Sequence, residues 1–220
     1  KPGGIVSQWI PLHSQAETHV YQHFRTFYES FPYAMAWYPV NKEMILIGSN
    51  QPINIDFQGI EERLHNPVIN KIMSDIDFGT VNSFLGSIWF LKKELKNLGS
   101  GQHVISDNNP SLEFYLNFPK AISNNGIDKI VTNRASFEDV WGKITKPSLV
   151  TASGDICGIG GTCTGSTISD VVFTKDVFKK HWDSRLKTHY AVAHNNLGLT
   201  LSAEGKIEEA ISHYKMAIKL

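Results

Sequence analysis

Residues 33–49, YAMAWYPVNKEMILIGS, decide the fold class that the sequence predicts. Two apolar runs, 33–40 and 43–49, flank the polar pair Asn41-Lys42, and this arrangement is typical of a β-hairpin. The second run is apolar at four consecutive positions, which indicates a strand covered on both faces. We therefore expect a strand hairpin within a buried sheet.

The segment before the hairpin is typical of a strand followed by a helix. Residues 5–10 form a short apolar run after the turn residues at 2–4. Ser14 and Glu17 have the spacing of a capping box, in which the two side chains satisfy backbone amides of the first helical turn. The apolar residues that follow recur at helical steps: Ala16, Val20, Phe24, Phe27 and Phe31. Pro32 ends this helix, because the residue before a proline is disfavoured in the α conformation.

The predicted helix and the second predicted strand supply a core. The apolar stripe of the helix includes Phe24 and Phe27, and the strand includes Ile45 and Ile47. We expect these four side chains to be buried in one α/β layer.

Further elements follow the hairpin. Residues 58–98 contain two helical patterns, of which the second ends at Gly99, a residue favoured just past a helix. Its apolar residues alternate steps of three and four: Val81, Phe84, Ile88, Leu91, Leu95 and Leu98. Residues 111–118 alternate apolar and polar, as in a strand, and the Gly-, Ser- and Thr-rich residues 147–170 are typical of a linker.

Composition limits the classes of function. The chain has 220 residues, 41% of them hydrophobic, and 21 basic residues balance 21 acidic ones. This balance argues against a nucleic acid or an anionic membrane as the main partner. No apolar run reaches the ~20 residues that span a bilayer. Cys157 and Cys163 resemble the reduced thiols of a cytosolic protein, so we expect a cytoplasmic location and leave open a tether through membrane helices upstream of Lys1.

The last 30 residues, 191–220, have the spacing of a tetratricopeptide repeat (TPR). The small and large residues of the pattern are Leu197, Gly198, Leu201, Gly205, Ala210, Tyr214 and Ala217. Small residues allow two helices to approach closely, and Gly205 permits the tight turn between them. His194 stands where the repeat usually has a large aromatic residue. Because a repeat needs about 34 residues and stacked neighbours, we expect the array to continue beyond Leu220 and to bind a protein or peptide; an ordinary helical hairpin is the alternative.

The first part of the chain resembles a known enzyme family. The stretches PGGIVSQW (2–9), AWYPVNKEMILIGSN (36–50) and SDNNPSLEF (106–114), in this order and followed by a TPR, resemble the C-terminal half of spermidine synthase-like polyamine aminopropyltransferases. A strand, a helix and a strand hairpin also form the last part of the methyltransferase-type sheet of such enzymes. The resemblance therefore implies an α/β fold: the C-terminal part of a doubly wound, Rossmann-like sheet with an antiparallel edge hairpin.

The resemblance also implies a reaction. Family members transfer an aminopropyl group from decarboxylated S-adenosylmethionine to an amine such as putrescine. The donor-binding turn and the carboxylate that deprotonates the amine lie upstream of Lys1 by this comparison, so we expect no catalytic residue and no cofactor site within this chain. Gln8 and Tyr38 match polar positions near the amine pocket, which makes them the expected substrate-binding residues. The SQW sequence at 7–9 departs from the SQGE of spermidine synthases and leaves the acceptor amine open.

Three other motifs have simpler explanations. CGIGGTCTG at 157–165 lacks the lysine and the following helix of a phosphate loop, and its two cysteines lack a second ligand pair for zinc. His19 and His23 stand four residues apart, but the glutamate of a zinc protease is missing, and we expect two solvated histidines. No metal site is expected.

The expected domains are therefore residues 1–146, the aminopropyltransferase-like part; 147–170, the linker; and 171–220, a helix plus the TPR at 191–220. Two rivals stay open: a non-catalytic interaction protein that carries the TPR, and a methyltransferase that uses S-adenosylmethionine itself. The sequence also leaves open a homo-oligomer.

Overall fold

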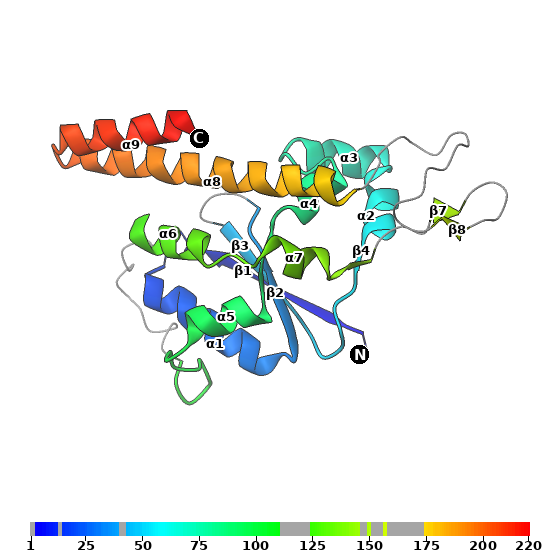
Figure 1. The fold of residues 1–220 in the computed structure, drawn as a ribbon. Coiled ribbons are helices and arrows are strands. Elements are labelled where there is room, and N and C mark those ends of the chain that lie inside the picture. The colour runs from blue at the N-terminus through cyan, green and yellow to red at the C-terminus, as the bar shows by residue number, and fades with distance from the viewer. Residues whose placement is uncertain are drawn as a thin grey trace.

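The computed structural model describes residues 3–12, 15–39, 43–110, 124–145, 149–150, 156–157 and 174–220. Within these ranges the elements follow one another as shown in Figure 1. The strands are β1 (Ile5–Pro11), β2 (Tyr33–Trp37), β3 (Glu43–Ser49), β4 (Ile55–Asp56), β5 (Ile88–Leu91), β6 (Ile144–Thr145), β7 (Leu149–Val150) and β8 (Ile156–Cys157). The helices are α1 (Glu17–Ser30), α2 (Phe57–Leu64), α3 (Pro67–Ser74), α4 (Val81–Leu85), α5 (Lys92–Gly99), α6 (Asn124–Thr132), α7 (Phe137–Trp141), α8 (Lys175–Ala203) and α9 (Ile207–Lys219).

A four-stranded sheet has the order β1-β3-β2-β5, and each neighbouring pair is antiparallel. The predicted pairing of β2 with β3 is confirmed, while the turn residues Asn41 and Lys42 lie outside the described ranges. Because β1 and β2 both run antiparallel to β3, they run parallel to each other. Helix α1 connects these two parallel strands, and β3 then inserts between them.

The sheet separates two apolar cores. The first core contains Phe24 and Phe27 of α1, which are 0% and 3% exposed, and it confirms the prediction for these two residues. The prediction of a single layer is wrong, because Ile45 and Ile47 are partly buried and Ile47 packs against the second core. Since successive side chains of a strand point to opposite faces, a continuous apolar strand cannot place every residue in one layer. Met44 and Leu46 of β3 face α1 instead.

The structure also corrects the long helix predicted over residues 81–98. This segment forms α4, then β5, then α5, and β5 pairs with β2 at the edge of the sheet. Trp89 and Phe90 of β5 are completely buried. The helical spacing of the apolar residues therefore does not decide the structure of this segment. Pairing with β2 and burial on both faces make residues 88–91 a strand in spite of that local pattern.

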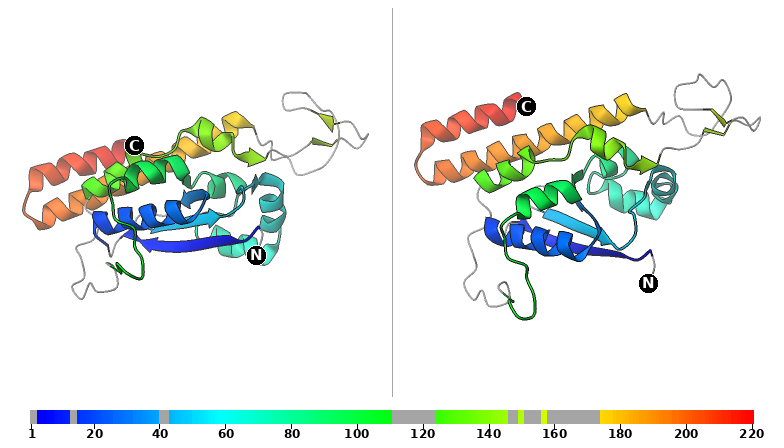
Figure 2. Two further views of the ribbon diagram at one scale, coloured as in Figure 1. Left: turned by 90° about the horizontal axis from the view of Figure 1, so that it is seen from below. Right: turned by 60° about the horizontal axis from the view of Figure 1, so that its bottom comes forward.

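Helix α8 runs along the molecule above α6 and α7, and α9 folds back on it (Figure 1). It has 29 residues and is continuous across residue 191, so the first TPR helix is the C-terminal part of a longer helix. Its N-terminal half places Phe178 and Trp182 in the second core, and Ala193 lies in the first. The two turned views in Figure 2 show the same arrangement, with α9 lying along the C-terminal part of α8.

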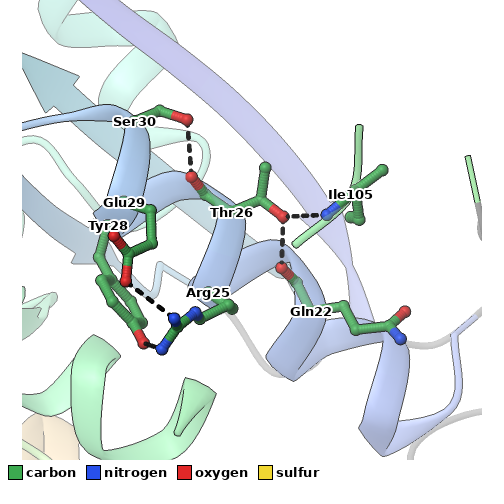
Figure 3. A network of polar contacts seen from close by, with 7 residues as sticks. All are labelled: Gln22, Arg25, Thr26, Tyr28, Glu29, Ser30 and Ile105. Carbon is green, nitrogen blue, oxygen red and sulfur yellow. Dashed lines mark hydrogen bonds and ion pairs between the residues drawn. The ribbon is translucent and has the colours of Figure 1, made fainter. Parts of the chain in front are cut away.

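Helix α1 holds the loop that follows α5. Thr26 Oγ1 donates to the carbonyl of Gln22 at 2.8 Å and accepts the backbone amide of Ile105 at 2.8 Å (Figure 3). Beside it, Arg25 donates to the Tyr28 hydroxyl and pairs with Glu29 at 3.1 Å. These contacts join the partly buried side of α1 to that loop, while Phe24 and Phe27 of α1 pack in the first core.

The fold class is therefore mixed α/β with a helical TPR region. The predicted capping box is wrong, because α1 begins at Glu17 with Ala16 as its N-cap and without a side-chain cap bond. Three predictions lie wholly or largely outside the described residues: the strand at 111–118, the linker at 147–170 and Cys163. Within the described part of the chain, no helix is both long and apolar enough to cross a membrane.

Candidate functional site

Gln8 lies in β1 on the sheet face that α1 covers. Its Nε2 donates to Nδ1 of His23 at 3.2 Å. Burial, helped by the neighbouring His19, lowers the pKa of His23 to about 4. The His23 ring is therefore neutral at physiological pH, and its bond to Nε2 fixes the orientation of the Gln8 amide.

The expectation of two solvated histidines is wrong for His19, which is 6% exposed. Burial lowers its pKa as well. Among the described residues, no three His, Cys, Asp or Glu side chains gather in a way that could hold a metal ion.

Tyr38 follows β2 and is completely buried. Its ring stacks on that of His189 from α8, with centroids 4.6 Å apart, and meets Trp89 edge-on at 4.8 Å. Burial, together with the charges of Arg185 and Arg134, lowers the pKa of His189 to about 3. A neutral His189 thus completes an aromatic cluster beneath α8.

Arg134 ties this cluster to α8. Its guanidinium lies 3.4 Å from the ring centroid of Trp182 and 4.7 Å from that of Trp89. It also donates to the carbonyls of Trp182 at 3.2 Å and Gly86 at 3.1 Å. Burial lowers the pKa of Arg134 to about 9. The sequence did not predict this residue, since a lone arginine carries no local signal; the aromatic pair Trp89-Phe90 was the available hint.

The two predicted substrate-binding residues share a sheet face but not a set of neighbours. Gln8 lies opposite Leu46 of β3, whereas Tyr38 lies beyond the end of β2, where its amide donates to the carbonyl of Ser87 at 2.7 Å. The enclosure of Tyr38 by α8 separates it from solvent. Roles for both in amine binding stay predictions.

A cavity of about 310 Å³ opens elsewhere, where α5 begins beside β2. Its floor includes Ala34 and Met35, and its charged lining residues are Lys92, Lys93, Glu94, Asp139 and Lys143. Lys92 is held by the carbonyl of Phe31 at 2.7 Å, and Glu94 caps α5 by accepting the amide of Leu91 at 3.1 Å. The surplus of ammonium groups does not suit a cationic polyamine.

The C-terminal hairpin has the close packing that a TPR requires. A Cβ atom at Gly198 would lie 2.5 Å from the ring of Tyr214, so the helices touch at this point. Ala210 is 1% exposed. Gly205 has a φ of +77°, which favours glycine in the turn. The predicted pair of helices is confirmed, with α9 starting at Ile207.

Comparison with known proteins supports only the prediction of a TPR in the C-terminal hairpin. The tetratricopeptide repeat family matches residues 191–220. No curated protein matches the chain significantly, and neither does any solved structure. The chain therefore carries a TPR, a kind of module that commonly binds proteins.

Proposed function

We propose that the chain is the C-terminal part of a polyamine aminopropyltransferase-like protein that carries a TPR interaction module. The strand order carries this proposal. Parallel β1 and β2 are linked by a helix, with antiparallel β3 inserted between them. The β2–β3 hairpin is internal and not at the edge as predicted, because β5 pairs with β2 and β1 with β3. The helix-linked parallel pair with an antiparallel strand between its members nevertheless agrees with the methyltransferase-type sheet that the quoted sequence stretches imply.

The free edge of β1 is consistent with a larger sheet. Among the described strands β1 pairs only with β3, and its Ile5 and Trp9 are 64% and 60% exposed. The strand contains no charged residue that would protect an open edge against pairing. Under the proposal, a parallel strand of the donor-binding part would pair with this edge.

Gln8 is the residue of this chain best suited to the amine. The reaction forms a bond between the amine nitrogen and the aminopropyl carbon and breaks the bond from that carbon to sulfur. A protonated amine is not a nucleophile, so a base must first take its proton. The Gln8 amide, held by neutral His23, can hydrogen-bond an amine without adding a positive charge that would repel it.

The burial of Tyr38 supports the alternative proposal of a non-catalytic interaction protein. Complete burial under α8 is typical of a packing residue, and an interaction protein would need only the rigid support that this cluster gives to the TPR. The methyltransferase rival predicts the same strands and differs only in the donor used.

The proposal is tested with a protein that includes the upstream donor-binding part. Supplied with decarboxylated S-adenosylmethionine and putrescine, it should form spermidine, whereas S-adenosylmethionine should give no methyl transfer. Gln8→Leu should raise the Michaelis constant for the amine, and the control Gln58→Leu on α2 should leave it unchanged. Absence of aminopropyl transfer with several amines, in a folded protein that binds a partner through its TPR, would favour the interaction protein.

Tyr38 is tested in the same assay. If it contacts the amine, Tyr38→Phe should weaken amine binding by one hydrogen bond, about 0.5–1.5 kcal/mol. An unaltered Michaelis constant would remove Tyr38 from the site.

A further inference from the structure

Two histidines connect the helices of the TPR hairpin. His194 of α8 and His213 of α9 approach with their Nδ1 atoms 3.0 Å apart. Their rings are nearly stacked, with centroids separated by 5.2 Å and planes inclined by 27°. Both side chains are half-buried. The pair therefore occupies the seam of the hairpin in the place where the repeat usually has a large aromatic residue.

The short distance between the two Nδ1 atoms restricts how many protons the pair can hold. A hydrogen bond between them requires that one Nδ1 donates and the other accepts. The accepting ring must be neutral at that nitrogen, since an imidazolium is a donor at both nitrogens. Two protonated rings would lose the hydrogen bond and bring two positive charges together. The closed hairpin can thus accept at most one extra proton at this contact.

The surrounding charges do not change this conclusion. One turn from His213 on α9, the charged residue is Glu209. The residues one turn from His194 on α8 carry no charge. Helix α6 also packs on α8, and its described charged side chain, Lys129, is engaged by Glu17 of α1 at 2.7 Å. A single carboxylate cannot compensate two adjacent imidazolium groups.

We propose that His194 and His213 form a proton-sensitive latch that holds α9 against α8 and loosens the TPR hairpin when both rings are protonated. Separated helices can keep two imidazolium groups apart, which the 3.0 Å contact of the closed hairpin does not allow, so closure weakens in acid. The latch concerns the hairpin itself and stands apart from the aminopropyltransferase proposal.

Hydrogen exchange of α9 amides at pH 7.5 and 5.5 tests the latch, after correction for the intrinsic effect of pH on exchange. If one proton is taken up on opening, the opening equilibrium should rise about tenfold between these values. Amides of β3 serve as an internal reference for effects on the α/β part. In His213→Asn the amide can keep a hydrogen bond to His194 without being protonated, so the tenfold change should disappear.

The control is His181→Asn, which removes an exposed histidine of α8, the helix that also carries His194, and should keep the wild-type response. His194→Asn provides a second variant if His213→Asn loses its protection at pH 7.5. Unchanged protection of α9 at pH 5.5 in the wild-type chain would overturn the proposal. So would an equal acceleration in the wild-type chain and in the Asn variant that stays protected at pH 7.5.

Discussion

The α/β part and the TPR hairpin depend on different kinds of information in the sequence. In the hairpin, contacts run between two consecutive helices joined by a short turn, and the spacing of small and large residues predicts both helices. In the α/β part, β5 is a strand because it pairs with β2, some fifty residues earlier in the sequence. Local periodicity predicts structure well where the contacts are local, and poorly where distant pairing decides.

Helix α8 belongs to both regions. Its first half is buried in the α/β cores through Phe178, Trp182 and His189, whereas its last turns pack against α9. The domain division with a linker at 147–170 stays a prediction. Residues on either side of that segment are in contact, since the Arg134 guanidinium lies on the rings of Trp89 and Trp182.

The largest effect is expected where α8 enters the core. Trp182 is 3% exposed and lies under the Arg134 guanidinium. Trp182→Ala should lower the free energy of unfolding by about 3–5 kcal/mol, because it leaves a cavity beside a buried charge. Val177→Ala, at a 38% exposed position of the same helix, should change it by less than about 0.5 kcal/mol. Urea denaturation measures both, and equal effects would show that α8 is not docked.

A change within the hairpin should have a smaller effect. Ala210 is nearly inaccessible at the α8–α9 contact, so Ala210→Leu should overpack it and destabilise the hairpin by about 1–3 kcal/mol. The exposed Ala203 supplies the control Ala203→Leu. Hydrogen exchange of α9 amides measures the difference, and an unchanged rate in Ala210→Leu would contradict the repeat packing.

Acid should weaken the α/β part through His189. The pKa of this ring is about 3 in the folded chain and near 6.5 in an unfolded one. The unfolded state therefore binds a proton first, and stability is lost as pH falls from 6.5 toward 3. Between pH 7.5 and 5.5 the loss should be about 1.4 kcal/mol. His189→Gln should reduce this pH dependence in urea denaturation, while His181→Gln should retain it.

The smallest effect concerns the link between α1 and α6. Lys129 and Glu17 are 2.7 Å apart, with side chains 52% and 25% exposed. Lys129→Met should cost about 0.2–1 kcal/mol, because a solvated ion pair is weak. The cost should shrink in 0.5 M salt. A loss above 2 kcal/mol would mean that the pair has a structural role beyond its charge.

Much of the candidate site could not be predicted from sequence. The resemblance selected Gln8 and Tyr38, but not His23, which orients Gln8, nor His189, which covers Tyr38. These partners come from α1 and α8, and only the packing of both helices on one sheet face brings them near. The prediction of one layer for Ile45 and Ile47 failed for a related reason. The apolar sequence of β3 indicates a buried strand, but it does not say which face of the sheet each side chain takes.

Helix α8 joins a core held by contacts between residues distant in the sequence to a hairpin held by contacts between consecutive helices. Native-state hydrogen exchange in increasing urea tests this role of α8 most directly, because it measures the opening free energy of each segment. We expect residues 178–193 of α8 to open together with β2 and β3 in global unfolding, while α9 opens at a lower free energy. This expectation would be contradicted if the first half of α8 opened with α9 and before the sheet.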